Sequence, residues 1–223
     1  MINGTGHKRV CTKSLGMRKI GLLIIIGLIC GCASNRPLPF DERPLTAVMP
    51  FAYSAQPPEF ANSVGGLADS LAGALVRTGR MRLVERQRVE AVMQEVQHGM
   101  TGAVDSATAA KIGRQLGAET VVIGAVVSVA VLEESRSMKF AEKADRWVEV
   151  VVEARMVAVE TGELIASGKA VGKAKSKQRQ AFGGQLGKLA PPEALFQKAL
   201  QDVGDKLAET IAKNVPPRSK LKS

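Results

Sequence analysis

The chain has 223 residues, of which 31 are basic and 21 acidic, giving a net charge of +10, and only 4% are aromatic. A basic balance can indicate nucleic-acid binding, but a single Trp and a single Tyr provide no platform on which bases would stack. Five basic residues and no acids precede residue 32, so the remainder carries 26 − 21 = +5. Composition therefore argues against a nucleic-acid partner and allows one domain with a sizeable core.

Residues 1–31 have the order of a secretory signal peptide. Met17-Arg18-Lys19 gives a basic start, Ile20 to Ile29 is an uncharged apolar run, and small residues with a cysteine follow. A membrane-spanning helix needs about 20 apolar residues, so a spanning anchor is the weaker alternative. Met17 is the expected start, with residues 1–16 an upstream extension.

Two cysteines, Cys30 and Cys32, end this leader. A disulfide across one glycine would be strained, and neither Cys11 nor the chain's two histidines complete a zinc site. We therefore expect no metal and no cofactor there. The ending Ile29-Cys30-Gly31-Cys32 resembles the lipobox of bacterial lipoproteins, which implies cleavage after Gly31 and a lipid on Cys32.

Residues 32–45, with prolines at 37, 39 and 44, predict an extended, lipidated tether, in which Ala33 to Pro44 reach at most about 40 Å. No aspartate follows Cys32, which favours attachment to the outer membrane on its periplasmic face. The mature chain holds no second cysteine, so its hydrophobic core must stabilise the fold without a disulfide.

Residues 46–214 predict one α/β (α+β) domain, and residues 215–223 a basic tail. Apolar patterns indicate strands at 46–51, 81–85, 119–132, 146–159 and 164–172. Helices are expected from Asn62 to Gly79, around 89–96, from a cap at Asp105 or Ser106 to Gly117, and from Pro192 to before Pro216. This order, β-α-β-α-α-β-β-β-α, predicts a single mixed sheet with helices packed on it.

The chain offers few groups for catalysis, and no G-x-S-x-G, Walker or G-x-G-x-x-G motif occurs. His98 is expected to be a capping or surface residue at a helix end. Gly65-Gly66 opens a helix and is only a weak anion-site signal. Glu133-Glu134 is expected in a highly charged, solvated turn. We therefore predict a protein that is not an enzyme.

Six segments carry a family pattern, namely Ala47–Phe51, Arg82–Arg86, Met100–Asp105, Ala109–Ala118, Val121–Gly124 and Val159–Glu163. In this order and spacing they resemble the CsgG family of curli-secretion lipoproteins. The resemblance implies a periplasmic α/β domain tethered to the outer membrane and often assembled in rings. In its best-known member the family forms a secretion pore for amyloid subunits.

The two segments that correspond to that member's membrane-crossing hairpins are highly charged here. Residues 133–146 hold eight charged residues among fourteen, and residues 169–188 hold six basic residues and no acid. A basic residue facing lipid at mid-bilayer costs about 2–4 kcal/mol. We therefore expect a family member without the transmembrane pore hairpins.

The basic stretch 169–188 has two interpretations. One is a mobile, solvated loop. The other is an electrostatic contact with something acidic, such as phospholipid headgroups or an acidic partner, made by Lys169, Lys173, Lys175, Lys177 and Arg179.

Two functions of different classes remain open. The first is an outer-membrane-anchored periplasmic lipoprotein that serves as a non-catalytic assembly, scaffold or secretion-accessory component for surface structures, associating with itself or with another envelope protein. The alternative is a regulatory lipoprotein that binds and activates a cell-wall enzyme, similar to penicillin-binding-protein activators. A tether of about twelve residues favours a place near the membrane.

Mass spectrometry of the protein from membranes tests the leader. We expect the mature N-terminal peptide to begin at an acylated Cys32, because the signal peptide is removed after Gly31. A Cys32→Ala variant should lose both cleavage and lipid, whereas Cys30→Ala should keep both. An unmodified Cys32 on an intact chain would end this account.

Overall fold

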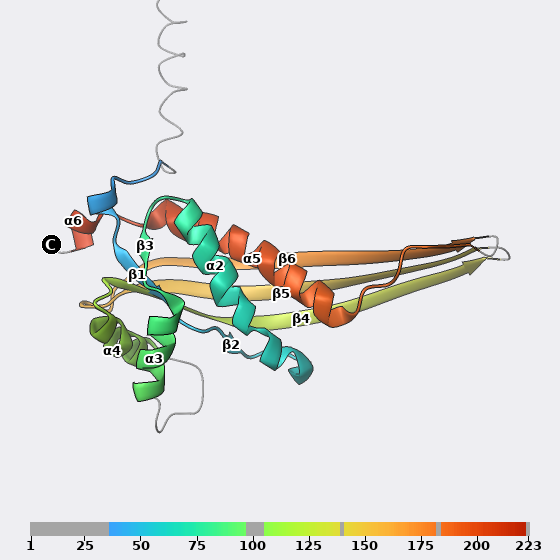
Figure 1. The fold of residues 1–223 in the computed structure, drawn as a ribbon, viewed down its shortest axis with the longest axis horizontal. Coiled ribbons are helices and arrows are strands. Elements are labelled where there is room, and N and C mark those ends of the chain that lie inside the picture. Colours follow the sequence, from blue (N-terminus) through green and yellow to red (C-terminus); the bar gives the residue numbers. More distant parts are fainter. Residues whose placement is uncertain (1–35, 97–104, 139–140, 182–183, 222–223) are drawn as a thin grey trace, which may run out of the picture. The chain divides into compact units, whose positions relative to one another are not determined.

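The computed structural model describes residues 36–96, 105–138, 141–181 and 184–221 (Figure 1). One sheet has the strand order β3-β1-β4-β5-β6-β7, and β2 also pairs with β4. β1 pairs parallel with β3 and β4, β2 pairs parallel with β4, and β4 to β7 pair antiparallel. The bounds are β1 Leu45–Val48, β2 Ala52–Tyr53, β3 Arg82–Leu83, β4 Thr120–Met138, β5 Ala141–Ala158, β6 Leu164–Ala181 and β7 Gly184–Leu186. This is the mixed sheet that the sequence predicts.

Helices cover both faces of the sheet. α2 (Gly65–Arg77) and α5 (Pro192–Asn214) pack on one face, and α3 (Arg86–Val96) and α4 (Ser106–Leu116) on the other. Because successive strand side chains point to opposite faces, β4 serves both cores, Val122 on the α2–α5 side and Val121 on the α3–α4 side. Phe60, in the 3-10 helix η3 (Pro58–Ser63), stacks on Phe196 of α5 with ring centroids 4.7 Å apart. Within the described residues, no helix has the length and apolar character needed to span a membrane.

The ends of α4 form as expected. The Asp105 carboxylate accepts a hydrogen bond of 2.7 Å from the Thr108 amide, and Gly117 follows the helix in the left-handed conformation at φ 66°. Gly162 likewise supplies a positive φ of 73° in the turn between β5 and β6. The predicted cap at Asp105, the glycine that ends α4 and the turn at Gly162 are confirmed. His98 and Cys32 lie outside the described residues.

The described part of the predicted tether is packed against the domain instead of running as an extended chain. We call residues 36–42, which end in the 3-10 helix η2 (Phe40–Glu42), the strap. The Leu38 amide donates to the Gly79 carbonyl at 3.0 Å, and Arg80 donates to the Arg36 carbonyl at 2.9 Å. The predicted basic tail is also docked, because α6 (Arg218–Leu221) bonds through Ser219 to Glu42 at 2.8 Å.

The three long strands differ most from expectation. β4 runs on to Met138, β5 starts at Ala141, and β6 continues to Ala181. Glu133-Glu134 therefore lies in a strand and not in a turn, and the interpretation of residues 169–188 as a loop is wrong for Lys169 to Ala181. Some of the charged side chains in these extensions meet an opposite charge on the neighbouring strand, as Arg146 meets Glu133 and Lys175 meets Asp145.

The packing of α5 on β6 depends on Gly172. A β-carbon there would lie 2.0 Å from the Ala199 carbonyl oxygen and 2.6 Å from Val203 Cγ2. We expect Gly172→Ala to lower the free energy of unfolding by about 1–3 kcal/mol, since backbone must move to admit the methyl group. Urea unfolding measures this effect. Gly65→Ala is the control, since nothing lies within 4 Å of its added β-carbon.

Candidate functional site

Beyond the helices, β4, β5 and β6 continue together as a long extension of the sheet (Figure 1). We call residues 132–138, 141–147 and 175–181 the arm. At its base Leu132 pairs with Trp147 and Trp147 with Lys175, and at its far end Met138 pairs with Ala141 and Ala141 with Ala181. Register partners lie on the same face, so the arm has one face on the side of α5 and one face on the opposite side, which we call the open face.

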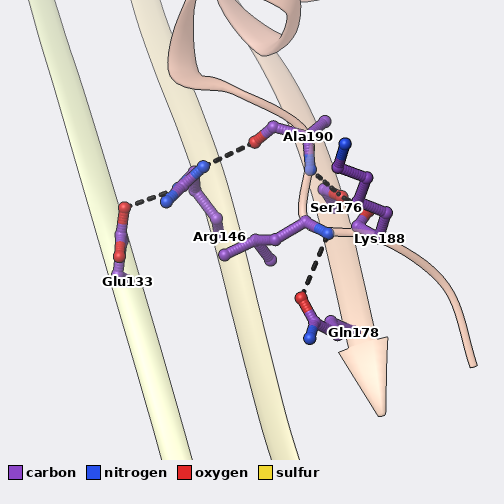
Figure 2. Close-up of polar contacts among 7 residues, drawn as sticks. Glu133, Arg146, Ser176, Gln178, Lys188 and Ala190 are labelled. Atoms are coloured by element: carbon purple, nitrogen blue, oxygen red, sulfur yellow. Dashed lines mark hydrogen bonds and ion pairs between the residues drawn. The ribbon is translucent and has the colours of Figure 1, made fainter. Parts of the chain in front are cut away.

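The face on the α5 side is covered by the chain that returns from β7 to α5. Figure 2 shows Arg146 of β5 between Glu133 of β4 and the Ala190 carbonyl, to which its Nη1 donates at 2.6 Å. Ser176 of β6 accepts from the Ala190 amide at 2.9 Å, and Gln178 accepts from the Leu189 amide at 3.3 Å. Side chains of β5 and β6 therefore fix the returning segment to the arm, and Glu133 of β4 bonds Arg146.

The open face centres on Asp145, whose side chain is only 5% exposed. Its Oδ2 atom lies 2.9 Å from Nζ of Lys175 and 3.3 Å from Nζ of Lys143. Lys175 also lies over the ring of Trp147, 5.0 Å from the centroid. The hydrogen bond from Lys175, helped by Lys143, holds the pKa of Asp145 below its ordinary value against the opposing effect of burial.

The basic residues of β6 are partly neutralised by acids of β5. Lys169 pairs with Glu153 at 2.9 Å and Lys173 with Glu149 at 2.8 Å. Residues 169–188 contain no acid, but the neighbouring strand β5 supplies carboxylates that pair with part of their positive charge. In the part of the chain that the structure describes, Lys177 and Arg179 have no carboxylate within ion-pair distance, and both are exposed. Of the five predicted contact residues, these two keep their charge unpaired.

The two borders of the arm differ. The border formed by β6 is covered, because β7 pairs with Arg179 to Ala181 and the Asp202 carboxylate of α5 accepts from the Lys173 amide at 3.1 Å. The border formed by β4 is paired with β1 and β2 only as far as Val126. From Ser128 to Met138, no strand among the described residues covers it. Val131 and Leu132, 36% and 42% exposed, lie next to each other on this edge.

This arrangement has two features suited to binding another molecule. An uncovered strand edge offers backbone N–H and C=O groups to another strand, and the open face offers charge. Among the residues that the structure describes, no group of three or more His, Cys, Asp or Glu side chains is placed to hold a metal ion. The fold is a mixed-sheet domain whose three long strands extend into the arm.

The family follows from a comparison with known proteins. Residues 40–216 match the model of the curli production assembly/transport component CsgG. The chain belongs to the CsgG family. A search of curated proteins found no match.

Solved structures give distant likenesses. The C-terminal domain of LpoB from Salmonella enterica is 19% identical, with 67% of this chain and 92% of that one covered, at a TM-score of 0.41. Lipoprotein GNA1162 from Neisseria meningitidis is 19% identical, with 69% and 90% covered, at 0.43. The PelC dodecamer from Paraburkholderia phytofirmans is 13% identical, with 82% and 94% covered, at 0.33.

Reasoning from sequence missed the pairing of the β6 lysines with the acids of β5 and the stacking of Lys175 on Trp147. A signal was present, because Asp145, Glu149 and Glu153 recur every four residues, and so do Lys169, Lys173 and Lys177. Extending both strands in antiparallel register places these two series opposite each other, as observed.

Asp145→Asn tests the open-face cluster. A lowered pKa in the folded state means that ionised Asp145 stabilises the protein above its unfolded pKa of about 3.9, and that this contribution is lost as pH falls through the folded pKa. We expect the variant to unfold at lower urea concentration near neutral pH and to approach the wild type in acid. Lys175→Gln in the Asp145→Asn background should cost less than Lys175→Gln alone. Equal costs would show that the pair is not coupled.

Proposed function

We propose that this protein is a periplasmic lipoprotein, attached to the outer membrane through acylated Cys32, that acts as a non-catalytic assembly or secretion-accessory component for surface structures. Membership of a family described by curli production, assembly and transport supports this general role. The observation that carries the proposal is the uncovered edge of β4 from Ser128 to Met138. The protein would act by pairing this edge with a strand of another molecule.

The uncovered edge supports self-association by strand addition. A partner strand along Ser128 to Met138 would make about ten backbone hydrogen bonds, since roughly one forms per residue of a paired edge. The arm's other border is already paired with β7 and is not free for the same strand addition. A contact between the β4 edge of one copy and a different surface of its neighbour is head-to-tail, and it generates a ring when the rotation closes.

The arm's surface supports a family member without pore hairpins. Membrane-crossing strands need an apolar face toward lipid. On the open face, register brings together Glu134, Asp145 and Lys177, followed by Arg136, Lys143 and Arg179. On the other face it brings together Glu133, Arg146 and Ser176, followed by Ser135, Ala144 and Gln178. Neither of these faces offers a hydrophobic band.

Lys177 and Arg179 support an electrostatic contact with an acidic protein partner or cargo near the end of the arm. Lys169, Lys173 and Lys175 contribute less to such a contact, because each already pairs with an acid of β5. Exposed charges of this kind steer association more than they strengthen it, and salt screens them.

The alternative function, activation of a cell-wall enzyme, requires the domain to meet that enzyme across the periplasm. The strap bears on this requirement, because its backbone is bonded to the domain from Arg36 onward. Only three residues, 33–35, then separate the acylated cysteine from the bonded chain. This short reach favours the assembly role. Cross-linking in cells separates the two functions by retrieving either copies of this chain or a cell-wall enzyme.

Leu132→Lys tests association through the β4 edge. The side chain is 42% exposed, so the fold should tolerate the change, whereas a lysine on the edge opposes pairing. We expect the association constant to fall at least about tenfold, equivalent to about 1.4 kcal/mol for each interface. Native mass spectrometry of the acylated protein in detergent measures the oligomers.

Leu164→Lys is the matched control, because Leu164 is 57% exposed and begins β6, away from this edge. It should leave the oligomers unchanged. A wild-type protein that stays monomeric at every concentration would contradict the proposal, and so would a Leu132→Lys variant that assembles normally.

A further inference from the structure

The strap presents an aromatic side chain to solvent at the end of the domain where the chain enters. Phe40 is 67% exposed, the largest exposed fraction among the large apolar residues that the structure describes. The guanidinium groups of Arg43 and Arg82 lie 5.9 Å and 5.4 Å from its ring centroid. Two cations therefore border an exposed aromatic ring, a combination that suits the boundary between headgroups and acyl chains.

The backbone behind Phe40 is held in place. Arg43 donates through Nε to the Leu38 carbonyl at 2.8 Å, and Arg82 donates through Nε to the Arg43 carbonyl at 3.1 Å. On the other side, Glu42 accepts from the amide and the hydroxyl of Ser219. The ring is thus presented on an ordered surface built from both ends of the chain.

The strap and its immediate surroundings are positively charged. The strap, the residues that bond to it and α6 carry six cations against the carboxylates of Asp41, Glu42 and Glu119, a net charge of +3. The cations are Arg36, Arg43, Arg80, Arg82, Arg218 and Lys220. Each basic residue near an anionic membrane adds to attraction, and the ring adds an apolar contact.

The short chain between the acylated cysteine and the strap favours the membrane as the partner of this surface. Residue 36 follows the acylated cysteine by four positions, which span at most about 13 Å when fully extended. If the lipid lies in the bilayer, Arg36 stays within that distance of the membrane surface. This step rests on the proposed function, whereas the exposed ring and the charge do not.

We propose that the strap and α6 form a membrane-docking surface in which Phe40 enters the headgroup layer of an anionic phospholipid bilayer and Arg36, Arg43 and Arg82 contact lipid phosphates. The acyl chain attaches the protein to the membrane, and docking in addition fixes which end of the domain faces it. Two weak signals, a lipid and a basic aromatic surface, together hold a domain more firmly than either one.

The arm is the competing surface, since Lys177 and Arg179 also carry unpaired charge in the described structure. It is the weaker candidate for lipid. The strands themselves set it far from the strap: Glu119, which bonds Arg218 of α6, immediately precedes the first residue of β4, and the arm ends at the last residue of β4. The chain's single tryptophan, Trp147, lies in the arm and reports on that region separately.

Vesicle co-flotation tests the docking surface without the acyl chain. The mature polypeptide, residues 32–223 with Cys32→Ala, includes the whole compact unit 35–223. We expect it to bind vesicles of phosphatidylethanolamine and phosphatidylglycerol in low salt and to bind phosphatidylcholine vesicles much less. Phe40→Ser should weaken binding about tenfold and Arg36→Gln about fivefold. Arg179→Gln removes the same charge from the arm and should change binding less than twofold.

Brominated lipids give a second readout. They should leave the fluorescence of Trp147 unchanged and should quench a tryptophan placed by Phe40→Trp in a Trp147→Phe background. Equal binding by Phe40→Ser and the unsubstituted polypeptide, quenching of Trp147, or loss of binding only in Arg179→Gln would each overturn the proposal. Because this protein carries no lipid, a failure here is distinct from a failure to acylate Cys32, which the mass measurement reports.

Discussion

The antiparallel register of β4, β5 and β6 is the constraint on which the rest of the structure depends. Apart from one bulge in each ladder, these strands pair from the helix-covered sheet to the end of the arm. A slip of one residue would exchange the two faces of a strand and would turn the valines of β5 away from α5. The buried series Val148, Val150 and Val152 therefore fixes the register for the arm as well, where no helix core would otherwise select it.

A bulge in β4 sets which side chains reach the open face. Val126 pairs with Val152 and Ser128 with Val151, so Val127 is an extra residue. Before the bulge, even-numbered residues of β4 such as Val122 face α5. After the bulge, odd-numbered residues such as Val129 face α5. Without the extra residue, Leu132 and Glu134 would point toward the returning segment instead of toward Trp147 and Asp145. The open face and the polar contacts of Figure 2 thus depend on one inserted residue.

Sequence reasoning predicted the domain well wherever burial produced a pattern. The element order, the cap at Asp105 and the glycine after α4 were all accessible, because apolar periodicity and cap chemistry are local. The arm was not, because its strands are stabilised by pairs such as Lys175–Asp145 between residues distant in sequence. In a single sequence, a run of charge is equally compatible with a solvated loop. The strap was missed for a similar reason, since Arg80 joins the carbonyls of Arg36 and Val215 across the whole chain.

The separation between the strap and the end of the arm has a functional consequence. β4 extends from Thr120, beside β1, to Met138, which at roughly 3.3 Å per residue is a distance of about 60 Å. Both termini of the described chain meet at the first end, where Ser219 bonds to Glu42, while the uncovered part of the β4 edge begins only at Ser128. A contact with a membrane at the strap and a contact with another strand along the arm therefore use separate surfaces. Neither contact needs to be released for the other to form, so an anchored subunit keeps its binding edge available.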